Sequence, residues 1–174
     1  FGEVFIKGLA DDGGLYVPKS IIKYNSAELS ELKKLNYNEL STEIINQFLG
    51  DFISKEKLLS LINKSYSTFR EKEVVKISNV GGIILLELFH GPTLAFKDIA
   101  MQFIGNLYEY YLGKNDKKIN IVVATSGDTG AAAIDAIKGK ANLNIFVLHP
   151  NNRISSVQRK IMTTVEESNV FNIA

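Results

Sequence analysis

Hydrophobic positions repeat at helical spacing in the first part of the chain. Leu40, Ile44 and Leu49 belong to one apolar stripe, and a second stripe runs through residues 58–69. Gly50 closes the first stripe, as glycine often does just beyond the last helical turn. No polar residue on either stripe suggests a site, so we expect a packed pair of helices.

The pattern changes near residue 74, after which strands alternate with helices. Apolar runs of strand length lie at residues 83–89, 119–124, 143–148 and 170–174. Helical patterns lie at residues 98–113, 129–138 and 155–167, with Gly113 and Gly139 as expected C-terminal caps. Alternation of this kind predicts parallel strands joined by crossover helices. We therefore predict a mainly helical domain over residues 1–73 and an α/β domain over residues 74–174.

Composition removes several classes of protein from consideration. The 174 residues include 20 Lys and Arg against 19 Asp and Glu, and the net charge of +1 gives no reason to expect nucleic acid or an anionic membrane as partner. The chain has no cysteine and two widely separated histidines, so we expect no disulfide, no thiol nucleophile and no metal. No apolar run approaches the length of a membrane span, and the N-terminus lacks a signal-peptide pattern. We expect a cytoplasmic protein.

A lysine stands between an apolar strand and the helical pattern that follows it. Gly91 and Pro92 stop the strand, and Lys97 directly precedes the helix expected from Asp98. An amine held beside apolar residues and the positive end of a helix is pushed toward its neutral form, which attacks carbonyl carbon. The pattern therefore predicts Schiff-base chemistry at Lys97, although a solvated lysine beside a helix start has the same pattern.

A glycine-containing turn at residues 126–130 lies at the end of the next strand. Its two glycines let the backbone approach an anion, and the hydroxyls of Ser126 and Thr129 stand beside the first N–H groups of the expected helix. The Gly-Lys-Ser/Thr ending of a nucleotide phosphate loop is absent. The turn predicts an anion site, with a purely structural tight turn as the alternative.

A third candidate lies at residues 150–158, again between a strand and a helix. Ser155 and Gln158 have the spacing of a capping box, and Arg153 places a positive charge just before the helix. A phosphate group would be stabilised there. A simple helix cap and a solvated arginine explain the same residues.

Three stretches of the chain resemble the threonine synthase family. Residues 90–98, His-Gly-Pro-Thr-Leu-Ala-Phe-Lys-Asp, are similar to its cofactor-lysine motif, residues 124–132 to its next signature, and residues 8–18 to its opening turn. The family comprises pyridoxal-phosphate enzymes of fold type II, the tryptophan-synthase-β-like group. The resemblance implies an α/β fold of that type, of which residues 74–174 would form a partial three-layer unit.

The resemblance also implies an activity, the conversion of O-phospho-L-homoserine and water to L-threonine and phosphate. Lys97 would hold pyridoxal 5'-phosphate as an internal aldimine and then move protons on the substrate. Phe96 would orient the lysine and exclude water, and Asp128 would lie near the cofactor ring. The residues implied in substrate binding are Ser126, Gly127, Asp128, Thr129, Arg153 and Ser155.

Members of the family are more than twice as long as this chain, and their loop for the cofactor's phosphate would follow Ala174. We therefore expect a fragment that carries one half of a split site, is inactive alone, and forms a homodimer or otherwise associates with itself through an exposed sheet edge and face. The alternatives are a threonine-synthase-like phospholyase that makes a keto acid, another fold type II enzyme such as threonine dehydratase or cysteine synthase, and a non-catalytic ligand-binding remnant.

Overall fold

The structure, a computed structural model, describes all 174 residues. They form two compact units, residues 1–63 and 64–174. The division falls inside a helix, earlier than the predicted domain boundary after residue 73. No helix of the chain combines the length and the apolar character needed to cross a membrane.

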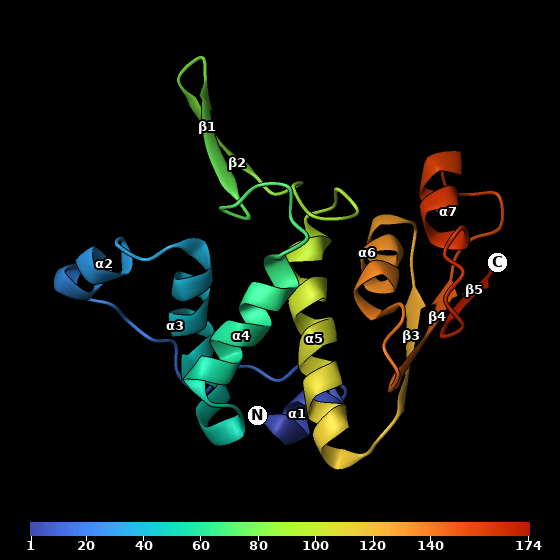
Figure 1. Cartoon of the computed structure of the whole chain (residues 1–174), viewed down its shortest axis with the longest axis horizontal. Helices are drawn as coiled ribbons and strands as arrows, with labels where there is room; N and C mark the ends of the chain where they lie inside the picture. Colours follow the sequence, from blue (N-terminus) through green and yellow to red (C-terminus); the bar gives the residue numbers. More distant parts are fainter. The chain divides into compact units, whose positions relative to one another are not determined.

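The first unit is built from helices (Figure 1). Its elements are α1 (Gly2–Lys7), α2 (Ser26–Leu32), α3 (Tyr37–Leu49), the 3-10 turn η1 (Gly50–Phe52) and most of α4 (Lys55–Tyr66). Helices α3 and α4 form where the two apolar stripes predict them, and Leu49, Leu58 and Ile62 are buried, whereas Ile44 of the first stripe is 38% exposed. Asn25 and Asn36 cap α2 and α3, each in a capping box with a glutamate. The hydrophobic pattern alone does not predict α1 and α2, which have only 6 and 7 residues.

The stretch that resembles an opening turn does form one. Leu9 and Leu15 pair as an antiparallel bridge, and the N–H of Ala10 donates to the carbonyl of Gly14 at 2.9 Å. Gly13 has a φ of 81°, a conformation that glycine adopts without strain.

The second unit begins with a hairpin instead of a strand of the parallel sheet. Strand β1 (Lys76–Val80) pairs antiparallel with β2 (Ile83–Glu87), and the two consecutive glycines between them have positive φ angles of 60° and 85°. The prediction that residues 83–89 belong to the parallel sheet is therefore wrong. Ile84 is 74% exposed in this hairpin. A continuous apolar run shows that a strand is present but does not identify its partner strand.

The parallel sheet contains β3 (Ile119–Ala124), β4 (Leu143–Leu148) and β5 (Val170–Ile173), in that order. Helix α6 (Asp128–Ile137) connects the first two strands, and α7 (Ser156–Thr163) connects the last two. Because the strands follow one another in sheet order, both connecting helices lie on the same face of the sheet. These strands confirm the predictions for residues 119–124, 143–148 and 170–174, the last ending one residue early.

Two helices differ in length from their predictions. Helix α5 (Lys97–Asn115) begins with the lysine itself and continues past Gly113, because Asp116 takes the left-handed conformation at φ 47° and caps the helix. Helix α7 ends at Thr163 instead of residue 167. The hydroxyls of Thr163 and Thr164 bond to carbonyls four residues earlier, as is common where a helix bends or ends.

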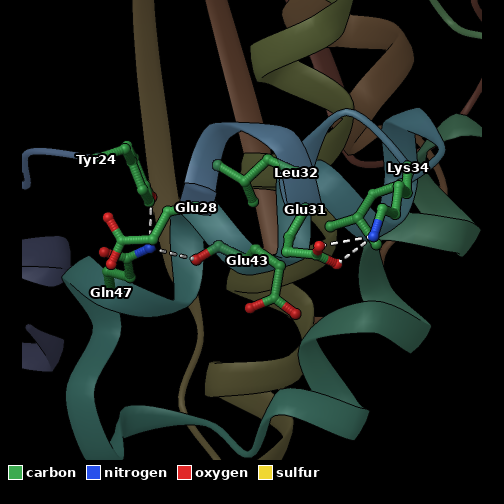
Figure 2. Close-up of a pocket in the computed structure, with 8 residues that line it drawn as sticks. Tyr24, Glu28, Glu31, Leu32, Lys34, Glu43 and Gln47 are labelled. Atoms are coloured by element: carbon green, nitrogen blue, oxygen red, sulfur yellow. Dashed lines mark hydrogen bonds and ion pairs between the residues drawn. The ribbon is translucent and has the colours of Figure 1, made fainter. Parts of the chain in front are cut away.

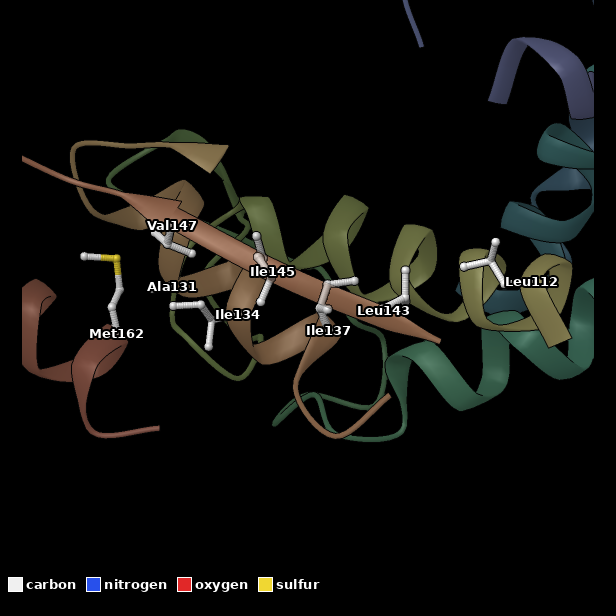
Figure 3. Packing of buried hydrophobic residues seen from close by; sticks show 9 residues of the cluster. Leu112, Ala131, Ile134, Ile137, Leu143, Ile145, Val147 and Met162 are labelled. Atoms are coloured by element: carbon white, nitrogen blue, oxygen red, sulfur yellow. The ribbon is translucent and has the colours of Figure 1, made fainter. Parts of the chain in front are cut away.

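One face of the sheet and the helices form the core (Figure 3). Ile145 and Val147 of β4 pack with Ile134 of α6 and Met162 of α7, and Leu112 of α5 closes the cluster. All five are at most 1% exposed, so this face excludes water.

The opposite face of the sheet carries exposed apolar side chains. Val122 and Ile173 are exposed, and the rings of Phe146 and Phe171 stack with centroids 4.6 Å apart. Parallel sheets are normally covered on both faces. This chain therefore contains two layers, helix and sheet, of the predicted three-layer unit.

Candidate functional site

Helices α5 and α6 lie side by side and begin at the same end of the second unit (Figure 1). Gly105 approaches α6 so closely that a Cβ there would lie 2.6 Å from the carbonyl oxygen of Ala136, and a side-chain hydrogen bond joins the helices nearer their starts. Lys97 lies eight residues before Gly105, and Asp128 lies eight residues before Ala136. The two helices therefore begin at about the same level. The lysine motif and the glycine turn therefore share the edge formed by the carboxyl ends of the strands, where open α/β sheets bind ligands.

The lysine turn, residues 90–98, is organised by a buried carboxylate. Asp98 is 0% exposed; its Oδ2 accepts from the backbone N–H of Thr93 at 2.8 Å, and its Oδ1 accepts from the Thr93 hydroxyl at 2.7 Å. Burial raises the pKa of Asp98, and the two hydrogen bonds from Thr93 oppose that rise. Gly91 packs against Asp98, since a Cβ on Gly91 would overlap that of the aspartate. Leu94 has a φ of 64°, unusual for leucine.

Lys97 lies half-buried at the first position of α5 and forms no ion pair with a carboxylate. Its Nζ stands 4.1 Å from the centroid of the Phe96 ring. Phe96 is 57% exposed, so in this chain it contacts the lysine but does not exclude water from it. The amine is therefore partly open to solvent, and no carboxylate holds it.

His90 holds the beginning of the lysine turn. Its Nε2 forms a 2.8 Å hydrogen bond with Oε2 of Glu87, its ring lies 4.6 Å from that of Phe89, and its carbonyl accepts from the N–H of Arg70 at 2.9 Å. These contacts give His90 a structural role at the end of β2.

The glycine turn, residues 125–130, is organised by a hydroxyl. Oγ1 of Thr125 accepts from the N–H groups of Gly127 and Gly130, each at 3.0 Å. A Cβ on Gly130 would overlap Cγ2 of Thr125, and one on Gly127, at φ 145°, would lie 2.6 Å from the side chain of Gln158. Packing against Thr125 thus favours glycine at position 130, and the positive φ favours glycine at position 127, whether or not an anion binds. The first two N–H groups of α6 have no acceptor within the helix, and Ser126 is exposed beside them.

Gln158 joins the glycine turn to the third candidate stretch. Its Nε2 donates to Oδ1 of Asp128 at 2.8 Å, and its Oε1 accepts from the hydroxyl of Ser155 at 3.0 Å. Ser155 caps α7 as predicted by accepting from the N–H of Gln158 at 3.2 Å, but the capping box is half formed because the glutamine side chain turns to Asp128. Arg153 lies exposed before the helix. Sequence spacing missed the role of Gln158, since its partner is 30 residues away.

A hollow of about 360 Å³ lies at the carboxyl ends of the three parallel strands. Its lining residues are Ala124, Thr125, Leu148, His149, Pro150, Ile173 and Ala174. His149 is 9% exposed, and its Nδ1 is buried without a hydrogen-bond partner. From the sequence alone, the two histidines were considered only as zinc ligands. The residues next to His149 in the sequence did not indicate that its side chain is buried at this edge of the sheet.

A second hollow, of about 490 Å³, lies in the first unit between α2 and α3 (Figure 2). Its acidic side chains are already paired: Glu31 with Lys34 at 2.6 Å, and Glu43 with Lys55. Glu28 completes the capping box of α2. None of the predicted site residues lies here. The acidic side chains of this hollow form ion pairs or cap a helix.

Sequence comparisons find relatives that are similar to this chain over its whole length. The family model described as Threonine synthase N terminus matches residues 1–66. The chain is 44% identical to the threonine synthase of Saccharomyces cerevisiae, covering 100% of this chain and 37% of the relative. It is 41% identical to that of Pseudomonas aeruginosa, with the same coverage, and 38% identical to Threonine synthase-like 2 of Homo sapiens, covering 98% and 36%.

Solved structures give the same result for the fold. The crystal structure of threonine synthase from yeast matches with a TM-score of 0.94 at 43% identity, over 99% of this chain and 37% of that one. The pyridoxal-phosphate-bound threonine synthase from Brucella melitensis matches with a TM-score of 0.90 at 39% identity, over 98% and 37%. The chain thus spans about 37% of the length of these relatives, with the fold expected for fold type II.

Proposed function

Because this chain belongs to the threonine synthase family and matches its N-terminal portion, we propose that the full-length protein converts O-phospho-L-homoserine and water into L-threonine and phosphate, with pyridoxal 5'-phosphate as cofactor. The observation that carries this proposal is a likeness extending over 99% of the chain at a TM-score of 0.94, not over one motif.

The residues of this chain fit the aldehyde end of pyridoxal phosphate. Lys97 offers a primary amine with no ion pair, at a helix start and beside an aromatic ring. When bound, the cofactor supplies an aldehyde that links to amines and a ring that accepts electron density from the substrate's reacting carbon. Lys97 would hold that aldehyde, and Phe96 and Asp128 would stand near the ring.

The other candidate residues serve the substrate. The first N–H groups of α6, with the hydroxyls of Ser126 and Thr129, form a donor set suited to the substrate's carboxylate. Arg153 and Ser155 suit its phosphate group, which needs charge and hydrogen-bond donors. The Lys97 amine, once free, takes and returns protons at Cα and Cβ of the substrate, which is general acid and base work.

The test is product identification with the full-length protein. O-phospho-L-homoserine should yield phosphate and L-threonine in equal amounts, whereas serine, threonine and O-acetylserine, the substrates of other fold type II enzymes, should react poorly. Lys97→Ala should lower the turnover rate by about a thousandfold. Lys114→Ala is the matched control, since Lys114 lies on the same helix with its Nζ 4.4 Å from the Tyr110 ring centroid. Absence of threonine, or an active Lys97→Ala variant, contradicts the proposal.

A second candidate function is a phospholyase that releases phosphate and ammonia and makes a keto acid instead of threonine. It is kept because relatives named Threonine synthase-like 2, from Homo sapiens and Xenopus laevis, are 38% identical over 98% of the chain. The same assay separates the two, because only the phospholyase gives phosphate with a keto acid and no threonine.

Two further expectations stay predictions. The cytoplasmic location is tested by cell fractionation. Self-association of this chain alone, motivated by the apolar sheet face that includes Val122 and Phe171, is tested by sedimentation at several concentrations; a monomer throughout contradicts it.

A further inference from the structure

The lysine turn contains a buried carboxylate that the proposed reaction does not use. Asp98 is 0% exposed and forms no ion pair; two donor groups of Thr93 bond to its carboxylate, and the backbone of Ala95 adds a further hydrogen bond. Burying a carboxylate without a cation is unfavourable. The hydrogen bonds stabilise the carboxylate but do not cancel the effect of burial, since the pKa of Asp98 stays raised. A group buried at a net cost indicates a role for its bonds in the turn.

These bonds hold closed a turn that is under conformational strain. They join residues five apart in sequence, with the positive φ of Leu94 between them. A leucine in the left-handed region is strained, because its Cβ comes too close to the following carbonyl oxygen. The turn also lacks space for rearrangement, because any side chain at Gly91 would overlap Asp98.

The same bonds fix the rotation of α5 at its start. Lys97 and Asp98 are the first two residues of this helix, and consecutive side chains of an α-helix point about 100° apart around its axis. When Asp98 is held inward by Thr93, Lys97 has to point toward the more exposed side, beside the Phe96 ring. A loose Asp98 would allow the first turn to fray or rotate, and the lysine would sample many directions.

We propose that Asp98 and Thr93 form a clamp that aims Lys97, with Asp98 as the positioning residue and no contact of its own with substrate or cofactor. The inference rests on the proposed function, since it assigns the clamp to the cofactor lysine. Directional control of a reacting group affects the rate of reaction more than the affinity for substrate.

Conservative variants of the full-length protein test the clamp. Thr93→Val keeps the shape and removes the hydroxyl bond; Thr93→Ser keeps the hydroxyl. Asp98→Asn keeps both contacts, because its amide oxygen can accept from the Thr93 N–H while its amide nitrogen donates to the hydroxyl. Thr42→Val is the matched control: Thr42 is 2% exposed and its hydroxyl also forms a 2.8 Å bond, to the carbonyl of Asn38.

Three readouts are compared: kcat, KM, and the rate at which added pyridoxal phosphate becomes linked to the apoprotein, followed by absorbance. Thr93→Val should lower kcat and the linkage rate about tenfold or more, with KM within about twofold, because a hydrogen bond to a charged group is lost. Thr93→Ser, Asp98→Asn and Thr42→Val should stay within about threefold of the wild type. Unfolding midpoints are measured in parallel.

The clamp is contradicted if Thr93→Val and Thr93→Ser behave alike, or if Thr42→Val loses as much as Thr93→Val, which would indicate general destabilisation. If Thr93→Val does not fold, Thr93→Ala takes its place: a linkage rate about tenfold or more below that of Thr93→Ser supports the clamp, and equal rates contradict it. A wild-type protein that links no cofactor at residue 97 overturns the proposed function, and the inference with it; that result is recognised without any variant.

Discussion

The lysine turn and the glycine turn both precede a helix at the same edge of the second unit, yet they are stabilised differently. In the lysine turn a buried carboxylate, Asp98, accepts two hydrogen bonds from Thr93. In the glycine turn a neutral hydroxyl, that of Thr125, accepts two backbone N–H groups. The first arrangement fixes one side chain, and the second leaves the first N–H groups of α6 available for an anion. Similar positions in the fold are thus suited to different tasks.

The two turns also differ in what surrounds them. Asp98 lies inside its own turn and is contacted closely by Gly91. The glycine turn depends on α7, because Gln158 and Met162 of that helix are the neighbours of Gly127 and Gly130. We therefore expect the lysine turn to tolerate substitution least.

Gly91→Ala should have the largest effect on stability. The new methyl group would overlap Asp98, which cannot move without breaking both bonds to Thr93, so we expect destabilisation of about 3 kcal/mol or more. Gly113→Ala is the control: that glycine is helical with no neighbour within 4 Å of an added Cβ, and the change should stabilise by about 0.5–1 kcal/mol. Denaturant unfolding of the full-length variants measures both. A neutral Gly91→Ala would show that the lysine turn is loose.

Gly130→Ala should have a smaller effect, about 1–3 kcal/mol. Its methyl group would meet Cγ2 of Thr125 and lie 2.8 Å from Sδ of Met162, and methionine is flexible enough to move. The same unfolding experiment decides the order. If Gly130→Ala is the more damaging, the expected ranking of the two turns is reversed.

Gln158→Ala should weaken binding of phosphorylated substrate more than it weakens folding. The change removes the side chain that bonds to both Asp128 and Ser155. The loss of one or two hydrogen bonds corresponds to about 1 kcal/mol, or about fivefold in the dissociation constant. Calorimetric titration of the full-length protein measures this effect. Gln47→Ala, which removes a glutamine from α3 in the first unit, is the control and should leave the affinity unchanged. Equal affinities for wild type and Gln158→Ala would limit Gln158 to capping.

The smallest effect concerns the dependence of stability on pH. It should differ between the lysine turn, which a carboxylate organises, and the glycine turn, which a hydroxyl organises. Burial raises the pKa of Asp98 above its ordinary value of 3.8. A raised pKa favours the folded state below the unfolded pKa, and this contribution is lost as pH rises through the folded pKa. Relative to wild type, Asp98→Asn should therefore gain stability as pH increases from about 3 to 7. Thr125→Val should show a constant difference, since a hydroxyl does not titrate there. A constant difference for Asp98→Asn would contradict the effect of burial.

Much of the fold follows from the hydrophobic pattern. Strands β3 and β4 match the predicted bounds, and α3 and α4 form where the apolar stripes predict them. An element that packs against others has apolar residues at the spacing of its own repeat, which the sequence shows directly. The hairpin was mispredicted since the partner of β2 is β1, and the choice of partner depends on two glycines with positive φ. Gly113 did not end α5, because a cap depends on the conformation of the following residues.

The candidate site was predictable in its location but not in its connections. Lys97, Ser126 and Ser155 all lie at carboxyl ends of strands or starts of helices, as their neighbours in sequence indicate. Sequence spacing did not indicate the bond from Gln158 to Asp128, nor the burial of His149. Long-range contacts of this kind arise from packing between elements and leave no local pattern.

The most direct measurement is to locate the cofactor on the chain. The full-length protein is mixed with pyridoxal phosphate, reduced with borohydride, digested and analysed by mass spectrometry. We expect one modified peptide, carrying the added mass on Lys97, and its disappearance in Lys97→Ala but not in Lys114→Ala. Modification of a different lysine, or none at a saturating cofactor concentration, would contradict the assignment of this turn as the cofactor site.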